Sequence, residues 1–495
     1  MKYVSTRGAS EAVTGAYAIV SGLTPEGALY VPEHVPGFPE DITLNDFCAL
    51  TYPQRATKIL APWLSEFSLA LLGAMCTQAY ASFDTPDVVP VKALSDNIFV
   101  LELFHGPTLA FKDMALQLLP HLLTASARLV GETRDILILV ATSGDTGKAA
   151  LMGFANKPGV RICVFYPDGG VSLAQKLQMV TQTGDNTRVV AVRGNFDDAQ
   201  TGVKQIFVNS DCVRMLNERN TVLSSANSIN LGRLIPQIAY YWSSYADLIN
   251  AGAIECGDPI NICVPTGNFG NILAAEYARQ MGLPVHKLIC ASNENHVLTD
   301  FIRTGVYDKN RDFHLTTSPS MDILISSNLE RLLFELANRD GDQIKQWMDD
   351  LKTTGRYALT GEALDKLQSL IWAGWADEKS VAQQIEETFC NEHYLLDPHT
   401  AVAMHVARDY RTQSGDMRPM LIAATASPYK FGKSVLGAID KDAYPEDDFA
   451  ACEQLAALVG ESVPEPIAVL RSSSVRHEDV CDIHDMWQAI LPILE

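Results

Sequence analysis

"LVATSGDTGKAALMGF", residues 139–154, joins an apolar run to a Gly-rich turn and then to a helical pattern. This order predicts a strand, a tight turn and a helix, the repeating unit of α/β proteins. The turn partly matches the ATP-binding loop template. However, Thr142 takes the place of its first glycine, and Ala149 that of the hydroxyl that would reach Mg²⁺. ATP binding is therefore disfavoured, but the free amides of such a turn still predict an anion site.

Seven apolar runs follow the same pattern along the chain. Amphipathic segments separate them, such as residues 172–184, where Leu173, Leu177 and Val180 recur at helical spacing. Near-continuous apolar runs are typical of parallel strands covered on both faces, so the sequence predicts doubly wound, open α/β sheets. Ligands of such sheets bind at the carboxyl ends of the strands. The expected strands are residues 97–104, 135–142, 161–167, 187–194, 260–267, 287–292 and 420–427.

The composition changes along the chain predict three parts. Residues 1–93 contain a Pro- and Gly-rich stretch and then a mostly helical pattern, which indicates an N-terminal subdomain. Residues 94–225 are expected to form a smaller α/β domain, and residues 226–495 a larger one. Residues 320–415 are expected to be helical and amphipathic, and they carry many of the acidic groups.

The overall charge limits the classes of partner. The 495 residues carry a formal net charge of -21, which disfavours nucleic acid and anionic membrane surfaces, because both need a basic footprint. Ten cysteines without a CxxC pair indicate reduced thiols rather than disulfides or a metal site. The N-terminus has no apolar signal region, and no run is long enough to span a bilayer. We expect a cytoplasmic monomer or homodimer that acts on a small molecule and holds no metal.

Lys112 follows an apolar strand and a turn marked by Gly106 and Pro107. An ordinary lysine here would be a solvated side chain beside Asp113, because lysine is almost always exposed. Its apolar flank, residues 109–111, indicates instead a partly apolar site, where desolvation lowers the pKa of the amine and makes it a nucleophile for a carbonyl. A Schiff base to pyridoxal phosphate is the commonest use of such a lysine.

A cofactor of this kind needs a phosphate site, and "VPTGNFGN" (residues 264–271) is a candidate. Glycines let the backbone approach a phosphate, and the helix that follows adds free amides and its dipole. The pattern is not GxGxxG, so a dinucleotide is disfavoured; a plain strand–helix turn is the alternative. Thr425 and Ser427, at the end of another strand, are candidates for a hydrogen bond to a cofactor ring nitrogen, with a helix cap as the alternative.

Five motifs together resemble threonine synthase, a pyridoxal-phosphate enzyme family of the tryptophan-synthase-β fold group. The resemblance covers most of the chain, from residues 6–8 to the last motif. The motifs are "HGPTLAFKD" (105–113), "ATSGDTG" (141–147), "SANSINLGRLIPQ" (225–237), "PTGNFGN" (265–271) and "ATASPYKF" (424–431). The resemblance implies the type II fold of pyridoxal-phosphate enzymes, with two doubly wound open-sheet domains and an N-terminal subdomain.

The resemblance also implies the roles of the cofactor-binding residues. Lys112 would form the Schiff base and would later act as the catalytic base. Thr425 would lie near the pyridine nitrogen and Asp145 near the ring 3'-oxygen. Relatives in this fold group often carry Asn at the position of Asp145, so it stays open whether this carboxylate is ionised or protonated. The cofactor phosphate would be held by Gly267, Asn268, Phe269, Gly270 and Asn271.

The implied substrate is O-phospho-L-homoserine, which the family converts with water into L-threonine and phosphate by β,γ-elimination and replacement. Ser143 and Thr146 would receive its α-carboxylate, so that the opening turn would bind a carboxylate rather than ATP. The substrate phosphate needs hydrogen-bond donors and a cation, and a planar guanidinium suits phosphate oxygens. The residues that match this role are Asn227, Ser228, Asn230 and Arg233, with an interface salt bridge as the alternative for Arg233.

Other functions stay open on the same scaffold. A serine or threonine dehydratase is disfavoured by Arg233 and its neighbours, whereas nothing in the sequence excludes a phospho-lyase that makes 2-oxobutyrate from the same substrate. A catalytically silent homologue is a further alternative. Lys148 stands where relatives usually place a small residue; we expect it on the solvent face, or else as an additional positive charge near the anions.

Overall fold

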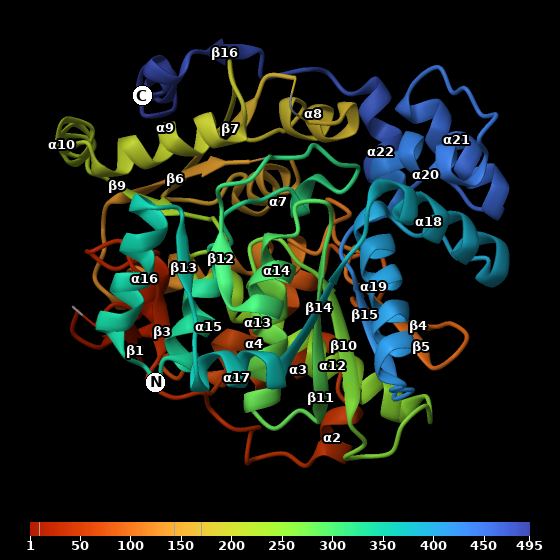
Figure 1. The fold of residues 1–495 in the computed structure, drawn as a ribbon. Helices are drawn as coiled ribbons and strands as arrows, with labels where there is room; N and C mark the ends of the chain where they lie inside the picture. Colours follow the sequence, from red (N-terminus) through yellow and green to blue (C-terminus); the bar gives the residue numbers. More distant parts are fainter. Residues whose placement is uncertain (9, 143, 170) are drawn as a thin grey trace.

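Two open sheets with helices on both faces form the body of the protein (Figure 1). The computed structural model describes residues 1–8, 10–142, 144–169 and 171–495. All seven runs expected as strands contain one, so the predicted α/β class is confirmed. The six-stranded sheet has the order β14-β11-β10-β15-β5-β4, and only β4 runs antiparallel to its neighbour. Its strands are β4 (Val91–Ala93), β5 (Ile98–Glu102), β10 (Ile260–Pro265), β11 (Val285–Ser292), β14 (Ile371–Trp375) and β15 (Met420–Ala424).

Alternating side chains divide the six-stranded sheet between two layers of helices. Ile262 and Val264 of β10 belong to the same apolar cluster as Leu273 of α13 (Gly270–Gln280). Cys263, between them, belongs to a second cluster with Val402 of α19 (Pro398–Ser414). Successive side chains of a strand point to opposite faces, so α13 and α19 cover opposite faces of the sheet. Burial on both sides explains the near-continuous apolar runs in the sequence.

The second sheet has five parallel strands in the order β16-β8-β7-β6-β9. Leu137 and Leu139 of β6 pack with α9 (Phe196–Val208), whereas Ile136 and Ile138 pack with α7 (Asp145–Phe154) in the large core that also includes the six-stranded sheet. The apolar core is therefore continuous from one sheet to the other. The strands are β6 (Asp135–Ala141), β7 (Val160–Pro167), β8 (Thr187–Val192), β9 (Thr221–Ser225) and β16 (Asp479–Cys481).

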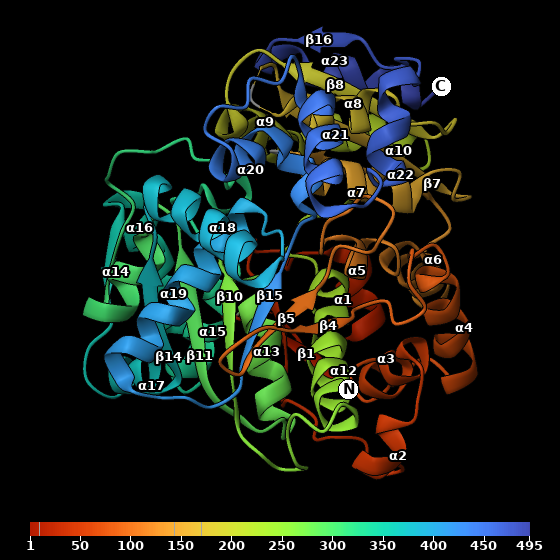
Figure 2. The same ribbon diagram turned by 90° about the vertical axis from the view of Figure 1, so that its right-hand side faces the viewer.

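Sheet membership does not follow the predicted boundaries at residues 93 and 225. β5, which precedes Lys112, pairs with β15 in the six-stranded sheet, although it was expected in the smaller domain. β16, near the C-terminus, pairs with β8 in the five-stranded sheet (Figure 2). Strand pairing depends on residues far apart in sequence, which local periodicity does not report. The expected helical region also contains a strand, β14, between α17 (Glu362–Leu370) and α18 (Glu378–Glu392).

The N-terminal segment packs against the six-stranded sheet's helices rather than standing apart. A small antiparallel sheet of β1 (Lys2–Ser5), β2 (Val13–Thr14) and β3 (Tyr30–Pro32) is followed by α3 (Tyr52–Leu60) and α4 (Leu69–Tyr80). α3 packs on α12 (Pro236–Asn250), where Arg55 donates to Asp247 Oδ1 at 2.6 Å. The described helices include none that is long and apolar enough to cross a membrane.

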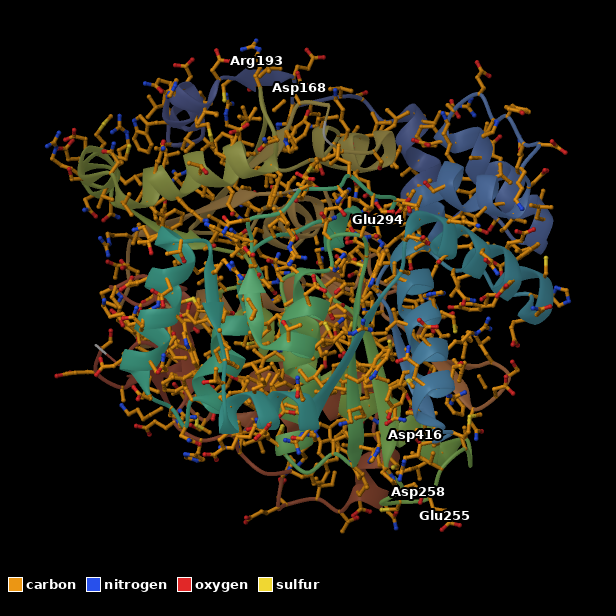
Figure 3. All side chains as sticks on the ribbon, in the orientation of Figure 1. Asp168, Arg193, Glu255, Asp258, Glu294 and Asp416 are labelled. Atoms are coloured by element: carbon orange, nitrogen blue, oxygen red, sulfur yellow. The ribbon has the colours of Figure 1, made fainter. Side chains whose placement is uncertain are left out.

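The carboxyl ends of the six-stranded sheet point toward the five-stranded sheet. Asp258 and Asp416, which precede β10 and β15, lie at the lower end in Figure 3. Glu294, which follows β11, lies at the level between the two sheets in the same view. The loops after β5, β10 and β15 therefore meet the smaller sheet. Ligands of parallel sheets bind at such ends, so this junction is where a site is expected.

Candidate active site

A cavity at this junction is lined by residues that follow β5, β6, β10 and β15. It brings together residues predicted for three different roles. These are Lys112, Thr146, Asn227, Ser228, Arg233, Gly267, Asn268, Phe269, Gly270, Asn271 and Thr425. Asp145 lies next to Lys112 without lining the cavity, and Asn230 does not line it either. Ser143, the other residue predicted to bind substrate, lies outside the described residues.

Backbone hydrogen bonds between two loops hold Lys112 in place. Phe111 N donates to Thr425 O at 2.8 Å, and Ser427 N donates to Leu109 O at 3.0 Å. Leu109 adopts a φ of 58°, a left-handed conformation that a branched side chain rarely takes, so these contacts hold the backbone in a strained turn. As a result, Lys112 and Thr425 line the same cavity, although they come from distant parts of the chain.

The amine of Lys112 lies in a largely enclosed, polar environment. Its Nζ donates to Ser320 Oγ at 3.2 Å and lies 3.8 Å from Asp145 Oδ2, with 12% of the side chain exposed. Burial lowers its pKa to about 8; Asp145 acts in the opposite direction, whereas Lys430 and Arg233 lower it further. The direction agrees with the lowered pKa expected for Lys112, and its main cause is burial. A neutral amine near physiological pH is what attack on a carbonyl requires.

This pKa predicts the pH at which Lys112 becomes reactive. Below about pH 8 the amine is protonated and inert, and above it the neutral form accumulates. In the cofactor-free full-length protein, we expect acetylation of Lys112 by acetic anhydride to reach half its maximal rate near pH 8, measured peptide by peptide with mass spectrometry. The exposed Lys379 serves as the internal reference. A midpoint at the usual lysine value, ~10.4, would contradict the assignment.

Asp145 forms a buried ion pair that sequence reasoning missed. Its Oδ1 accepts hydrogen bonds from Lys430 Nζ at 2.7 Å and from Gln175 Nε2 at 3.0 Å. Burial alone would raise the pKa of this carboxyl, but Lys430, then Lys112, and the hydrogen bonds hold it well below its usual range. This arrangement favours the ionised form of Asp145. Lys430 lies within a quoted motif, but no local pattern indicates its partner.

The turn between β6 and α7 is closed by the side chain of Thr142. Thr142 Oγ1 accepts from Gly144 N at 3.0 Å and from Gly147 N at 2.9 Å. A Cβ on Gly147 would lie 2.5 Å from Thr142 Cγ2, so this position has no room for a side chain. The expectation that Lys148 lies on the solvent face is wrong: it is 8% exposed, and its Nζ donates to Gln182 Oε1 at 2.7 Å, away from the cavity. The helix face that carries Lys148 packs inward.

The loop from Gly267 to Asn271 fits the phosphate of the predicted cofactor. Phe269, with a φ of 63°, turns the chain into α13. Among the described residues, none offers a hydrogen-bond acceptor to the five backbone amides of this loop. Asn271 Nδ2 is also buried without a partner there, while Tyr240 and Tyr241 donate to its Oδ1. Unpaired donors at a helix N-terminus are suited to an anion.

Gly267 gives a direct test of this phosphate site. A Cβ added there would lie 2.6 Å from Ser320 O, so Gly267→Ala has to displace the loop or the Ser320 segment. Because the amides of the loop would move, we expect Gly267→Ala to weaken pyridoxal phosphate binding by roughly 10- to 100-fold, the loss of about one hydrogen bond to a charged group. Gly437→Ala, whose Cβ would have open space, is the matched control and leaves the affinity unchanged in fluorescence titration. Equal affinities for both variants would contradict the assignment.

Arg233 is a buried cation with an unused donor. It is 3% exposed; its Nη1 donates to Ala226 O at 2.6 Å, and its Nε has no partner among the described residues. Burial lowers its pKa to about 10, so it stays charged at neutral pH. A buried, charged guanidinium without a carboxylate partner is typical of an anion site.

The neighbours of Arg233 differ in what they can bind. Asn227 and Ser228 line the cavity, and Ser228 Oγ lies 3.4 Å from Ser327 Oγ, which donates to Asn268 Oδ1 at 3.3 Å. Asn230 was predicted to bind the substrate phosphate, but its Nδ2 donates to two backbone carbonyls and its Oδ1 accepts from Gly232 N. Its side chain therefore caps the helix that carries Arg233, and Asn230 can act only through the position of Arg233.

Two further residues of the cavity wall were missed by sequence reasoning. Ser320 contacts Lys112, and its backbone N donates to His399 Nε2 at 3.2 Å. His399 Nδ1 lies 2.7 Å from Asp397 Oδ1, so the ring is held by a buried carboxylate. Ser320 lies in a short 3-10 helix (Pro319–Met321) and His399 at the start of α19. In the sequence, Ser320 follows a Ser-Pro pair and His399 follows an Asp-Pro pair. Both pairs are common at the start of any helix, so neither indicates a functional residue.

Comparisons with known proteins agree with this arrangement. Three family models match consecutive parts of the chain: "Threonine synthase N terminus" matches residues 2–80, "Pyridoxal-phosphate dependent enzyme" residues 84–424, and "Threonine synthase, C-terminal" residues 400–480. The chain is 43% identical to human threonine synthase-like 1, over 85% of this chain and 57% of that protein. It is 38% identical to threonine synthase of Pseudomonas aeruginosa, over 88% and 90% of the two chains.

Solved structures extend the similarity over the whole chain. Pyridoxal-phosphate-bound threonine synthase from Brucella melitensis has a TM-score of 0.84 at 35% identity, covering 100% of both chains. Threonine synthase from yeast has a TM-score of 0.87 at 31% identity, covering 100% of this chain and 98% of the other. The matched region spans 57% of the length of the threonine synthase-like 1 proteins.

Proposed function

Because the chain belongs to the threonine synthase family of pyridoxal-phosphate-dependent enzymes, we propose that it is an active threonine synthase. In this proposal it converts O-phospho-L-homoserine and water into L-threonine and phosphate, the last step of threonine biosynthesis. The observation that carries the proposal is the cavity itself. Its wall holds an amine with a lowered pKa, Lys112, and a buried guanidinium with an unused donor, Arg233. The amine is needed for proton transfer at the carbons of an amino acid. The guanidinium is needed to bind a phosphate in addition to the α-carboxylate.

Substrate binding is assigned to three parts of the wall. Arg233, with Asn227 and Ser228, binds the phosphate of the substrate through charge-assisted hydrogen bonds. The Thr146 side chain and the backbone amides of Asp145 and Thr146, at the start of α7, bind its α-carboxylate, for which the helix dipole is favourable. The loop from Gly267 to Asn271 binds the cofactor phosphate. The separate sites for the substrate's phosphate and α-carboxylate would orient the carbon chain between them.

Proton transfer is assigned to Lys112. When bound in the cavity, pyridoxal phosphate would supply the electron sink that stabilises negative charge on the substrate's carbons, while Lys112 is a free amine. The Lys112 amine removes a proton from Cα and then from Cβ, which allows phosphate to leave from Cγ. Arg233 holds the departing phosphate. Lys112 returns one of the two protons to Cγ, which becomes the methyl group, and the other to Cα. Water adds its hydroxyl at Cβ, and its remaining proton leaves with the phosphate, which completes L-threonine. A pKa of about 8 lets the same amine accept and donate a proton near neutral pH.

The decisive experiment is a product assay with O-phospho-L-homoserine and the full-length, cofactor-loaded protein. We expect L-threonine and phosphate in a one-to-one ratio, measured by amino-acid analysis and phosphate release. Formation of 2-oxobutyrate and phosphate instead would reject threonine synthase in favour of a phospho-lyase. Turnover of L-serine or L-threonine, with none of the phosphorylated substrate, would indicate a dehydratase. Because the chain is also similar to threonine synthase-like 1, absence of any product would support a catalytically silent homologue.

A further inference from the structure

Lys430 is a buried lysine at the centre of the site for which the mechanism above has no use. It lies in a short 3-10 helix after β15 (Pro428–Phe431), and its side chain is fully enclosed. Its Nζ donates to Asp145 Oδ1 at 2.7 Å and to Thr108 O at 2.9 Å. A buried lysine is costly unless it is paired, so this position needs an explanation.

These contacts join three loops that carry the chemistry. Thr108 lies in the loop before Lys112, Asp145 begins α7 after β6 of the five-stranded sheet, and Lys430 follows β15 of the six-stranded sheet. The ammonium therefore links the ends of strands from both sheets. The ammonium of Lys430 also fixes the position of the Asp145 carboxylate by binding its Oδ1. In this position the other oxygen, Oδ2, lies 3.8 Å from Lys112 Nζ.

The charges explain why Asp145 needs a second lysine. Lys112 is the nearest other cation, but in the proposed function its nitrogen bonds covalently to the cofactor and is released again during turnover. It therefore cannot be a permanent counter-ion. A buried carboxylate without one takes up a proton, because burial favours its neutral form. Only a cation that takes no part in the reaction can keep Asp145 ionised at every stage.

We propose that Lys430 is a positioning residue that keeps Asp145 ionised and aimed at the nitrogen of Lys112. The inference rests on the proposed function only in assuming that Lys112 holds the cofactor. Other charges face the pair as well. Arg233, like Lys430, lowers the pKa of Lys112. The carboxylate of Asp113 interacts with both Lys430 and the neighbouring Lys148. None of these hydrogen-bonds to Asp145, so Lys430 is its direct partner.

The test follows the visible absorbance of the cofactor-loaded, full-length protein against pH, without substrate. In Lys430→Met, Asp145 loses its counter-ion and takes up a proton, so the nitrogen at Lys112 loses a neighbouring anion. Asp145 raises the pKa of that nitrogen more than Lys430 lowers it, so the net effect is a decrease. We expect the spectral transition to move to lower pH by about one unit or more, the range for a single buried charge partner. Lys430→Arg, which keeps the charge, should restore most of the wild-type position.

A double variant shows whether Lys430 acts through Asp145. Asp145→Asn alone should move the transition in the same direction, and adding it to Lys430→Met should change little further. Lys148→Met is the matched control, because it removes another buried lysine of the same region that donates to Gln182 instead. It should leave the transition unchanged.

Two results would overturn the inference. One is an unchanged transition in a folded Lys430→Met protein; the other is additive shifts in the double variant, which would mean independent roles. If Lys430→Met does not fold, Lys430→Gln keeps a donor for Thr108 without the charge, and the same expectation applies. No O-phospho-L-homoserine is used, so a failed product assay would reject the proposed function without affecting this result.

Discussion

Lys112→Ala is expected to lower the turnover of O-phospho-L-homoserine by about 10⁴-fold or more, because it removes both the covalent anchor of the cofactor and the base. Lys112 Nζ donates to Ser320 Oγ in the cavity wall and lies 3.8 Å from Asp145 Oδ2, whereas the fully enclosed Lys430 donates to Asp145 and Thr108. The measurement is kcat, together with the visible absorbance of the purified protein.

The absorbance separates this role from a structural one. We expect the visible band of the bound cofactor to be absent in Lys112→Ala, while thermal unfolding stays close to that of the wild type. Lys112→Arg keeps the positive charge beside Asp145 but cannot form a Schiff base at neutral pH, so it should be equally inactive. A visible band or substantial turnover in either variant would mean that another lysine carries the cofactor.

Arg233→Ala is expected to have the second largest effect. Arg233 is the buried cation of the cavity wall with an unused donor, and hydrogen bonds to a charged phosphate contribute about 1.5–3 kcal/mol each. Losing one or two of them should lower kcat/KM for O-phospho-L-homoserine by roughly 10²- to 10³-fold. Much of the loss should remain in Arg233→Lys, because an ammonium cannot reproduce the planar, bidentate geometry.

A matched control distinguishes phosphate recognition from general damage. Arg411 is also a buried arginine, but it donates to the backbone oxygens of Asp96, Asn97 and Arg418, at the opposite end of the six-stranded sheet. Arg411→Lys should leave kcat/KM within a few-fold of wild type. Binding of pyridoxal phosphate should be retained in both Arg233 variants, because Gly267–Asn271 holds its phosphate. An unchanged kcat/KM in Arg233→Ala would place the substrate phosphate elsewhere.

Several features of the fold and the site were predictable because they depend on short-range physics. Burial on both faces of a parallel sheet leaves near-continuous apolar runs, so all seven expected strands were found. A Gly-rich turn before a helix tends to leave backbone amides unpaired, and among the described residues the amides of the loop from Gly267 to Asn271 have no acceptor. Apolar flanks indicated a lowered pKa for Lys112, and burial produces it.

Other expectations depended on contacts that local patterns do not encode. Asn230 was grouped with Arg233 because both belong to one motif. The side chain of Asn230 caps a helix, whereas Arg233 keeps one donor, Nε, that has no partner among the described residues. Lys148 was expected on the solvent face because isolated lysines usually are exposed, but its helix packs on both sides and buries it. A motif therefore identified the segment, and packing decided which of its side chains face the cavity.

By itself, the sequence determined the α/β class, the lysine that can hold a carbonyl cofactor and the loop that can hold a phosphate. Each of these depends on neighbours within a few residues. Only the tertiary structure decided that β5 and β16 join the sheets opposite to those expected, and that Lys430 meets Asp145. The physical reason is that strand pairing and buried ion pairs depend on the energy of contacts between distant segments. Local composition and periodicity carry no record of those contacts.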